Sequence, residues 1–114
     1  MKVNRDVAEH YKWGDRCVGW RLVDRTGLSV IQEQMPPGTR EARHFHRKSR
    51  QFFFVLRGTA RIEMNGNQYQ LLPQDGLEIP PDTPHQIFNE SNENLEFLLV
   101  SSPATAGDRV LSPA

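Results

Sequence analysis

The sequence predicts an all-β protein, and two observations favour this fold class. Short apolar stretches are separated at regular intervals by turn-forming Gly, Pro, Asn and Asp, and no long segment keeps a helical period. The chain has 114 residues, which suit one compact domain with a real hydrophobic core. A series of eight or more short strands in such a chain indicates a β-sandwich or barrel.

The first strands are expected after a polar N-terminal segment, residues 1–12, that could form a short helix or an irregular arm. Residues 16–23 and 28–35 have the apolar stretches of two strands, and Thr26-Gly27 between them favours a turn. Pro36-Pro37-Gly38 ends the second strand, because proline cannot donate a hydrogen bond to a sheet.

A β-hairpin is expected around Asn65-Gly66. Both central residues of a type I′ turn need positive φ, which Asn and Gly tolerate best. Apolar segments flank this pair at 60–64 and 68–72. Further strands are expected at 44–46, 51–57, 77–80, 85–89 and 95–100, whereas the tail from Ser101 carries few structural signals.

The segment 51–57 predicts an interface. Its sequence, QFFFVLR, is largely apolar on both faces of a strand. One face can line the interior, whereas the face with Phe52, Phe54 and Leu56 must be covered by a second sheet or a second subunit. We therefore expect a homodimer.

Charge and composition narrow the function classes. Fourteen basic and fourteen acidic residues give a formal net charge of zero, which does not suit a general nucleic-acid binder. No apolar run approaches the about 20 residues that cross a bilayer, and no apolar N-terminal segment marks a secretory signal. The single cysteine, Cys17, excludes an intrachain disulfide and suits a reducing compartment. We expect a cytoplasmic protein without nucleic-acid or membrane partners.

Three histidines occupy positions that metal binding would explain. His44 and His46 lie two residues apart, so on a strand their imidazoles point to the same side. His85 opens a later strand, after the rigid proline-rich loop 80–84. Neutral imidazoles are common ligands of zinc, nickel, iron and copper. The alternative is that all three are structural, and His10, in the polar N-terminal segment, is expected at the surface.

The spacing around these histidines resembles the two motifs of the cupin superfamily. Gly38-(x5)-His44-x-His46-(x4)-Gln51-(x6)-Gly58 matches the first motif in every spacing, with Gln51 where the family carries glutamate. Residues 75–89 resemble the second motif, including the proline before His85 and the asparagine after it. The second motif departs at Gln74 and Asp82, where glycine is usual, which affects turn geometry more than chemistry.

The resemblance implies a double-stranded β-helix (jelly-roll) barrel. It implies a single cupin domain over residues 1–114, with the motifs within roughly 28–100 between a short N-terminal arm and a C-terminal tail. It also implies one divalent transition metal ion (zinc, nickel, iron, manganese or cobalt) inside the barrel, with His44, His46, Gln51 and His85 as ligands. The alternative for Gln51 is an amide that lines the pocket and bonds to water or substrate.

The amide of Gln51 also bears on the expected chemistry. Together with three neutral imidazoles it leaves the two positive charges of the ion uncompensated. Anionic oxygen ligands should then bind more readily than at a carboxylate-ligated site. Certain cupins with a His-His-Gln-His set, including those that open unsaturated uronates in pectin breakdown, are similar in size and ligand pattern. We therefore predict a metal-dependent isomerase or lyase that acts on a small oxygenated anion such as a sugar acid or carbohydrate derivative.

Two other functions stay open. An Fe(II)-dependent dioxygenase needs iron and coordination positions for both substrate and dioxygen. A non-catalytic module that binds or senses a small ligand would show no turnover. The sequence identifies no proton-transfer residue. Glu33 and Glu78 are the carboxylates nearest to the motifs, but Glu78 is expected to point outward, opposite Ile79.

The candidates for the substrate pocket are Trp20, Arg40, Arg43, Phe53 and Phe88. Arg40 or Arg43 could orient an anion at the mouth, although a run of basic residues more often forms a solvated face. The tryptophans and Phe88 could wall the pocket or belong to the core. Cys17 is expected to be a small buried hydrophobic residue.

Overall fold

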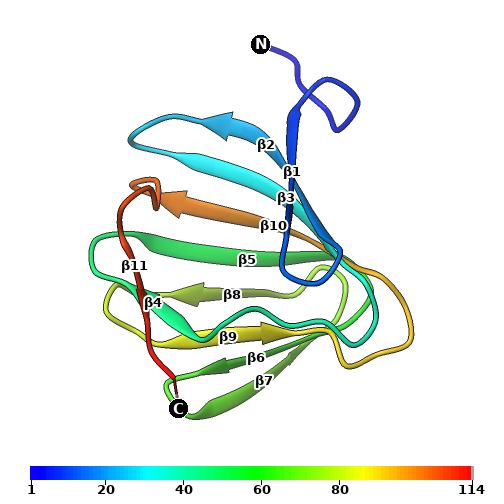
Figure 1. Ribbon diagram of the computed structural model, residues 1–114, viewed down its shortest axis with the longest axis vertical. Helices are drawn as coiled ribbons and strands as arrows, with labels where there is room; N and C mark the ends of the chain where they lie inside the picture. The colour runs from blue at the N-terminus through cyan, green and yellow to red at the C-terminus, as the bar shows by residue number, and fades with distance from the viewer. Residues whose placement is uncertain (114) are drawn as a thin grey trace.

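Two antiparallel β-sheets form the protein, which a computed structural model describes over residues 1–113 (Figure 1). In spatial order, the six-stranded sheet consists of β1 (Glu9–Trp13), β2 (Cys17–Asp24), β3 (Ser29–Met35), β10 (Leu95–Ser102), β5 (Arg50–Arg57) and β8 (Gly76–Ile79). The five-stranded sheet consists of β11 (Arg109–Leu111), β4 (His44–His46), β9 (His85–Phe88), β6 (Ala60–Met64) and β7 (Asn67–Leu71). The predicted jelly-roll fold is confirmed, as two separate sheets and not as a closed barrel.

Every strand expected between residues 16 and 100 is present, with ends shifted by two residues at most. Two strands were not predicted: β1, in the expected N-terminal arm, and β11, in the tail. Both are short and pair with a single neighbour, β1 with β2 and β11 with β4. Their extended conformation depends on the sheet edge that each one joins, which a local sequence pattern does not reveal. Within residues 1–113 no helix is long and apolar enough to cross a membrane.

The predicted hairpin between β6 and β7 is confirmed. Asn65 and Gly66 have φ values of 55° and 91°, and Met64 pairs with Asn67 across the turn. Gln74 and Asp82 also have positive φ, 75° and 61°. The turns that glycine usually forms in the second motif are therefore kept here by other residues.

The core lies between the sheets and follows the alternation of the strands. On β5, Phe53 and Val55 are buried, whereas Phe52 on the opposite face is 40% exposed. Phe97 on β10 packs against Phe53, with ring centroids 5.6 Å apart. The buried hydrophobic residues are Cys17, Met35, Phe53, Val55, Ala60, Ile62, Leu71, Ile79, Ile87, Leu95 and Phe97. Cys17 is thus the buried hydrophobic residue that we expected.

Asn89, the last residue of the second motif, links the turn after β9 to the core. Its side chain is fully buried and donates from Nδ2 to the carbonyl oxygens of Met35 and Glu93, both at 2.8 Å. Its Oδ1 accepts hydrogen bonds from the backbone and hydroxyl of Ser91. An alanine here would leave buried carbonyl groups without donors.

We expect Asn89→Ala to lower the free energy of unfolding by about 2–4 kcal/mol, since each buried polar group left unpaired costs about 1–3 kcal/mol. Urea denaturation measures the change. Asn92→Ala is the matched control, because Asn92 is exposed in the same turn. Equal stability of the two variants would contradict this role of Asn89.

Candidate metal centre

Three histidine side chains converge between the sheets. His44 and His46 project from the same face of β4, and His85 on β9 lies directly opposite His44 in the strand pairing. Their candidate ligand nitrogens all lie within 4.8 Å of one another, and all three side chains are buried. The structure therefore brings together the three histidines that the sequence singled out.

Backbone carbonyl groups orient the three imidazoles. Each Nδ1 lies at hydrogen-bond distance from one carbonyl oxygen: His44 from Ala42 at 2.8 Å, His46 from Asp108 at 2.9 Å and His85 from Thr83 at 2.9 Å. A neutral imidazole that donates from Nδ1 carries its lone pair on Nε2. All three rings can thus present Nε2 as a metal ligand.

The same burial keeps the imidazoles uncharged. Desolvation lowers the pKa of His44 to about 3 and that of His85 to about 4. Desolvation also lowers the pKa of His46 below its ordinary value. At neutral pH the site therefore presents lone pairs rather than N–H groups, which is the state that binds a metal ion.

Gln51 approaches from the other sheet. Its Nε2 donates to Oγ of Ser101, the residue opposite it on β10, at 3.0 Å. This contact leaves Oε1 buried and without a hydrogen-bond partner among residues 1–113. Nε2 of His46 and Nε2 of His85 are in the same situation. Buried acceptors in such a cluster need a cation or a donor. Three imidazole nitrogens and one amide oxygen fit a divalent transition metal ion.

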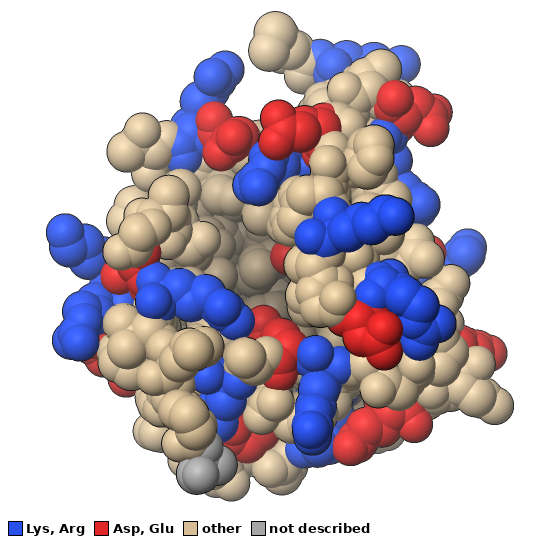
Figure 2. Space-filling model, in the orientation of Figure 1, with Lys and Arg blue, Asp and Glu red and all other residues tan. Residues whose placement is uncertain are grey.

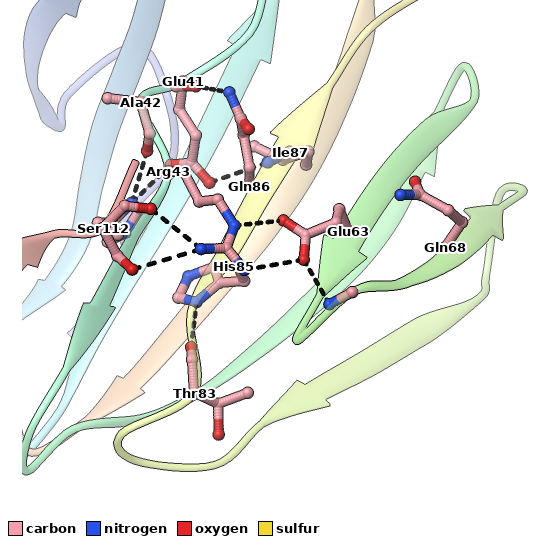
Figure 3. A network of polar contacts seen from close by, with 12 residues as sticks. Glu41, Ala42, Arg43, Glu63, Gln68, Thr83, His85, Gln86, Ile87 and Ser112 are labelled. Carbon is pink, nitrogen blue, oxygen red and sulfur yellow. Dashed lines mark hydrogen bonds and ion pairs between the residues drawn. The ribbon is translucent and has the colours of Figure 1, made fainter. Parts of the chain in front are cut away.

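Ionic and polar contacts hold the segment before β4 against β6, β9 and the C-terminal segment (Figure 3). Arg43 donates to the carboxylate of Glu63 at 2.7 and 3.2 Å and to the carbonyl oxygen of Ser112 at 3.0 Å. Nε2 of Gln86 donates to the carbonyl oxygen of Glu41 at 2.7 Å. These contacts keep β4 beside β9, where His44 and His85 meet.

The C-terminal segment supports His46. The carboxylate of Asp108 accepts three backbone N–H groups from the loop after β4, those of Arg47, Lys48 and Ser49, at 2.9–3.0 Å. Its own carbonyl oxygen orients the His46 ring. One residue from the tail thus links the loop after β4 to the metal centre.

A cavity of about 480 Å³ gives access to the site, with β1 and β11 contributing to its walls. Figure 2 shows the hollow on this face, with basic and acidic side chains around its rim. The cavity wall includes His44, His46 and Gln51. It also contains two acidic residues, Glu33 and Glu41, and two basic residues, Arg40 and Arg109. A small anion could contact ligands, acids and guanidinium groups together.

Both acidic residues hold their protons tightly. Burial raises the pKa of Glu33 to about 8, opposed by the neighbouring Tyr11 hydroxyl and the Arg21 charge. Burial likewise raises the pKa of Glu41 to about 8, and the charge of Glu33 adds to this effect. The Arg109 charge acts in the other direction on Glu41. Near neutral pH the cavity contains carboxyl groups that can either donate or accept a proton.

Of the five candidates for the substrate pocket, only Arg40 lines this cavity. Trp20 lies under the guanidinium of Arg5, 4.1 Å from the ring centroid, and Phe88 under that of Arg61 at 3.9 Å. Both rings alternate with inward-facing neighbours on their strands, and they therefore point away from the site. These placements correct the sequence-based expectation.

The other two pocket candidates have structural roles. Arg43 is engaged by Glu63 and Ser112 and does not line the cavity, which corrects its expected role at the mouth. Phe53 lies in the core, with its ring centroid 6.0 Å from that of His85. It packs beside a candidate ligand and does not line the cavity.

Sequence reasoning missed Tyr11, Glu41, Thr105 and Arg109, which all line the cavity. Trp13, for which the sequence left both a pocket wall and the core open, lines it too. Tyr11 and Trp13 alternate with polar residues, a pattern that could have indicated β1. Nothing in the tail distinguished Arg109. His10 is exposed, and Glu78 points outward in an ion pair with Arg50 at 2.6 Å, as expected.

Comparison with known proteins identifies the fold and the family. A family model described as a Cupin domain matches residues 31–101. Uncharacterized protein MJ1618 of Methanocaldococcus jannaschii is 29% identical over 75 residues, which cover 66% of this chain and 60% of that protein. Oxidoreductase macE of Penicillium terrestre is 31% identical over 100 residues, 83% of this chain and 38% of that protein. The chain thus spans less than two thirds of the length of either relative.

Two solved structures illustrate the fold. KdgF from Halomonas sp. superposes with a TM-score of 0.83 at 17% identity, covering 91% of this chain and 95% of that one. A sugar phosphate isomerase from a cupin superfamily, from Silicibacter pomeroyi, has a TM-score of 0.81 at 18% identity, covering 99% and 92%. At such identities the similarity shows the fold alone.

We expect the protein, purified without a nickel column, to contain one equivalent of a divalent transition metal, and His85→Ala to lose it. Gln51→Ala should weaken binding by about tenfold or more, whereas Gln51→Glu should strengthen it, because a carboxylate compensates part of the ion's charge. Elemental analysis and competition with a chelator measure both effects. Absence of metal from the wild type, even after reconstitution, would refute the assignment.

The free energy of unfolding of the metal-free protein should fall as the pH rises toward about 8. Glu33 binds its proton more tightly when folded, so its contribution is complete below its ordinary value of 4.5 and is lost through its folded pKa of about 8. The lowered pKa of His44 makes the free energy of unfolding rise with increasing pH, but only below the ordinary histidine pKa of 6.5.

Urea denaturation between about pH 6.5 and pH 9 therefore isolates the carboxyl contribution from that of the histidines. Glu33→Gln should make this pH dependence smaller, with Glu41 responsible for the remainder. A pH dependence that is identical in the wild type and the variant would contradict the raised pKa of Glu33.

Proposed function

The chain belongs to the Cupin domain family, and on that premise we propose that it is a metal-dependent enzyme of the isomerase or lyase type. The substrate in this proposal is a small oxygenated anion such as a sugar acid or carbohydrate derivative. The observation that carries the proposal is the set of uncharged buried donor atoms, three imidazoles and one amide, beside a cavity that also contains guanidinium and carboxyl groups. Such a site combines the means to bind an anion with the means to move a proton.

The recognition of an anion follows from the charges around the cavity. The neutral ligand set leaves the charge of a bound divalent ion uncompensated, and when bound the ion polarises a substrate oxygen. Arg109 lies close enough that its positive charge lowers the pKa of His44, His46 and Glu41. Nε1 of Trp13 is a buried donor without a protein acceptor on the same wall. A carboxylate that reached the metal would meet both groups.

The names of structural relatives support the choice of substrate class. The protein from Silicibacter pomeroyi, which shares the fold over 99% of this chain, is called a sugar phosphate isomerase. A sugar phosphate is a small oxygenated anion, and an isomerase leaves the net oxidation state of its substrate unchanged. A cavity of about 480 Å³ has room for a molecule of this size.

A second candidate is an iron-dependent oxidoreductase, such as a dioxygenase. The observation that favours it is the 31% identity over 100 residues to a relative named Oxidoreductase macE. A neutral three-histidine site can hold iron as well as zinc. Substrate conversion that consumes dioxygen, and that zinc cannot support, would favour this candidate over the isomerase or lyase.

We expect protein loaded with zinc to bind D-glucuronate more tightly than metal-free protein does, by isothermal titration calorimetry. Arg109→Met should weaken binding by about tenfold, since a charge-assisted hydrogen bond contributes about 1.5–3 kcal/mol. Arg50→Met is the control, because Arg50 is exposed and pairs with Glu78. NMR spectra of zinc- or nickel-loaded protein with sugar acids would test turnover. Equal glucuronate affinity with and without metal would contradict the proposal.

We also propose a homodimer that covers the outer face of β5. Phe52 is 40% exposed there, and its ring stacks with that of Phe54 with centroids 6.1 Å apart. Paired exposed aromatic residues on a sheet favour association. Light scattering should give a dimer mass for the wild type and a monomer mass for Phe52→Lys, while a monomeric wild type would refute the proposal. The cytoplasmic location stays a prediction from the sequence.

A further inference from the structure

A row of three residues crosses the six-stranded sheet beside the metal centre. Tyr11 on β1 pairs with Gly19 on β2, and Gly19 pairs with Glu33 on β3. Residues directly opposite each other in neighbouring strands project to the same face. Tyr11 and Glu33 both line the cavity that contains the candidate ligands. The register therefore places a phenol and a carboxylic acid on the wall that the metal centre shares.

The absence of a side chain at Gly19 brings the two groups together. A β-carbon at this position would lie 2.4 Å from Cζ and 2.6 Å from the hydroxyl oxygen of Tyr11. The Tyr11 ring therefore lies across Gly19, and its hydroxyl reaches the neighbourhood of Glu33. The guanidinium of Arg21, 4.4 Å from the ring centroid, holds the ring in place.

Glu33 is better placed for proton transfer than Glu41, the other carboxyl group in the cavity. Glu41 accepts the N–H of Ile87 at 3.0 Å, and its second oxygen lies 3.8 Å from Nδ1 of His44. Its carboxyl group is therefore held by the β9 backbone and lies beside a candidate ligand. Glu33 is 7% exposed, and its carboxyl group faces the cavity from the inner surface of β3.

We propose that Glu33 carries a proton between adjacent carbon atoms of a substrate with a hydroxyl group next to a carbonyl group, and that Tyr11 positions the Glu33 carboxyl group. This inference rests on the proposed function and names the acid–base residue and the substrate class of the same site. Burial strengthens the carboxylate as a base, and its pKa of about 8 suits a group that must gain and lose a proton near neutral pH.

The step is balanced within the substrate and one carboxyl group. The ionised Glu33 oxygen forms a bond to the proton on the hydroxyl-bearing carbon, and the C–H bond breaks. The electron pair of that bond forms the C=C bond of an enediolate, while the carbonyl π electrons move to the carbonyl oxygen, which then carries the negative charge. Glu33 then returns the proton to the former carbonyl carbon, one proton passes between the neighbouring oxygens, and the carbonyl group re-forms on the second carbon. No oxidant or reductant is required.

Exchange of carbon-bound hydrogen with solvent tests the inference. Zinc-loaded protein in deuterium oxide is incubated with hydroxypyruvate or D-glucuronate, and proton NMR follows the loss of the signal from the carbon beside the carbonyl. We expect Glu33→Gln to slow this loss by about a hundredfold or more, because acid–base catalysis contributes about 10²–10⁴-fold. Zinc content and probe affinity should be unchanged. Glu78→Gln is the matched control, an exposed carboxylate on the outer surface.

The outcomes separate this inference from the proposed function. Exchange that persists in Glu33→Gln overturns the role of Glu33 and leaves the proposed function intact. A wild type that binds both probes without exchange also overturns the inference. A wild type that binds no zinc by elemental analysis overturns the proposed function, and the inference with it. If Glu33→Gln fails to fold, Glu33→Asp is the second variant, because it keeps a carboxyl group but moves it closer to the β3 backbone and away from the substrate. Undiminished exchange in that variant would refute the inference.

The role of Tyr11 has its own readout. Tyr11→Phe keeps the ring over Gly19 and removes the hydroxyl, so the maximal exchange rate should fall by about tenfold while the half-saturating probe concentration stays the same. Gly19→Val should have a similar effect, because its side chain would occupy the space of the Tyr11 ring. A change in half-saturation alone would assign Tyr11 to substrate binding and refute its positioning role.

Discussion

Burial of three imidazoles against backbone carbonyl oxygens is the interaction on which the candidate metal centre depends. Desolvation keeps the rings neutral, and the carbonyl contacts leave each Nε2 lone pair toward the interior. Two of those carbonyl groups lie two residues before the histidine that they orient, Ala42 before His44 and Thr83 before His85. The backbone at the start of each strand thus determines which ring nitrogen keeps a free lone pair. A shift of one residue in strand register would turn the rings outward.

The two sheets make different contributions to the site. The five-stranded sheet supplies the histidines, which share one cluster because β4 and β9 are neighbours. The six-stranded sheet supplies Gln51 on β5 and, from β3 and β1, the wall with Glu33 and Tyr11. This division places the three imidazoles on one layer and Glu33 with Tyr11 on the other, and the cavity is lined from both.

Segments near both ends of the chain contribute residues to the site that the central strands form. β1 contributes Tyr11 and Trp13, and the segment before β11 contributes Asp108, which accepts three N–H groups from the loop after β4 and orients His46. Arg109 adds a positive charge that lowers the pKa of His44 and His46. Without these segments the central strands would still hold the histidine motif, but the cavity would lack Tyr11, Trp13 and Arg109.

The sequence by itself determined the fold class, nine of the eleven strands, the Asn65-Gly66 hairpin and the convergence of the histidines. These features are local: alternation sets which side chains share a face, and turn residues set where strands end. Only the tertiary structure decided which side chains line the cavity, because that depends on which strands become neighbours. Tyr11 meets Glu33 across Gly19, whereas Trp20 and Phe88 face outward under arginines. Strand pairing and register, which join residues distant in sequence, are the physical reason.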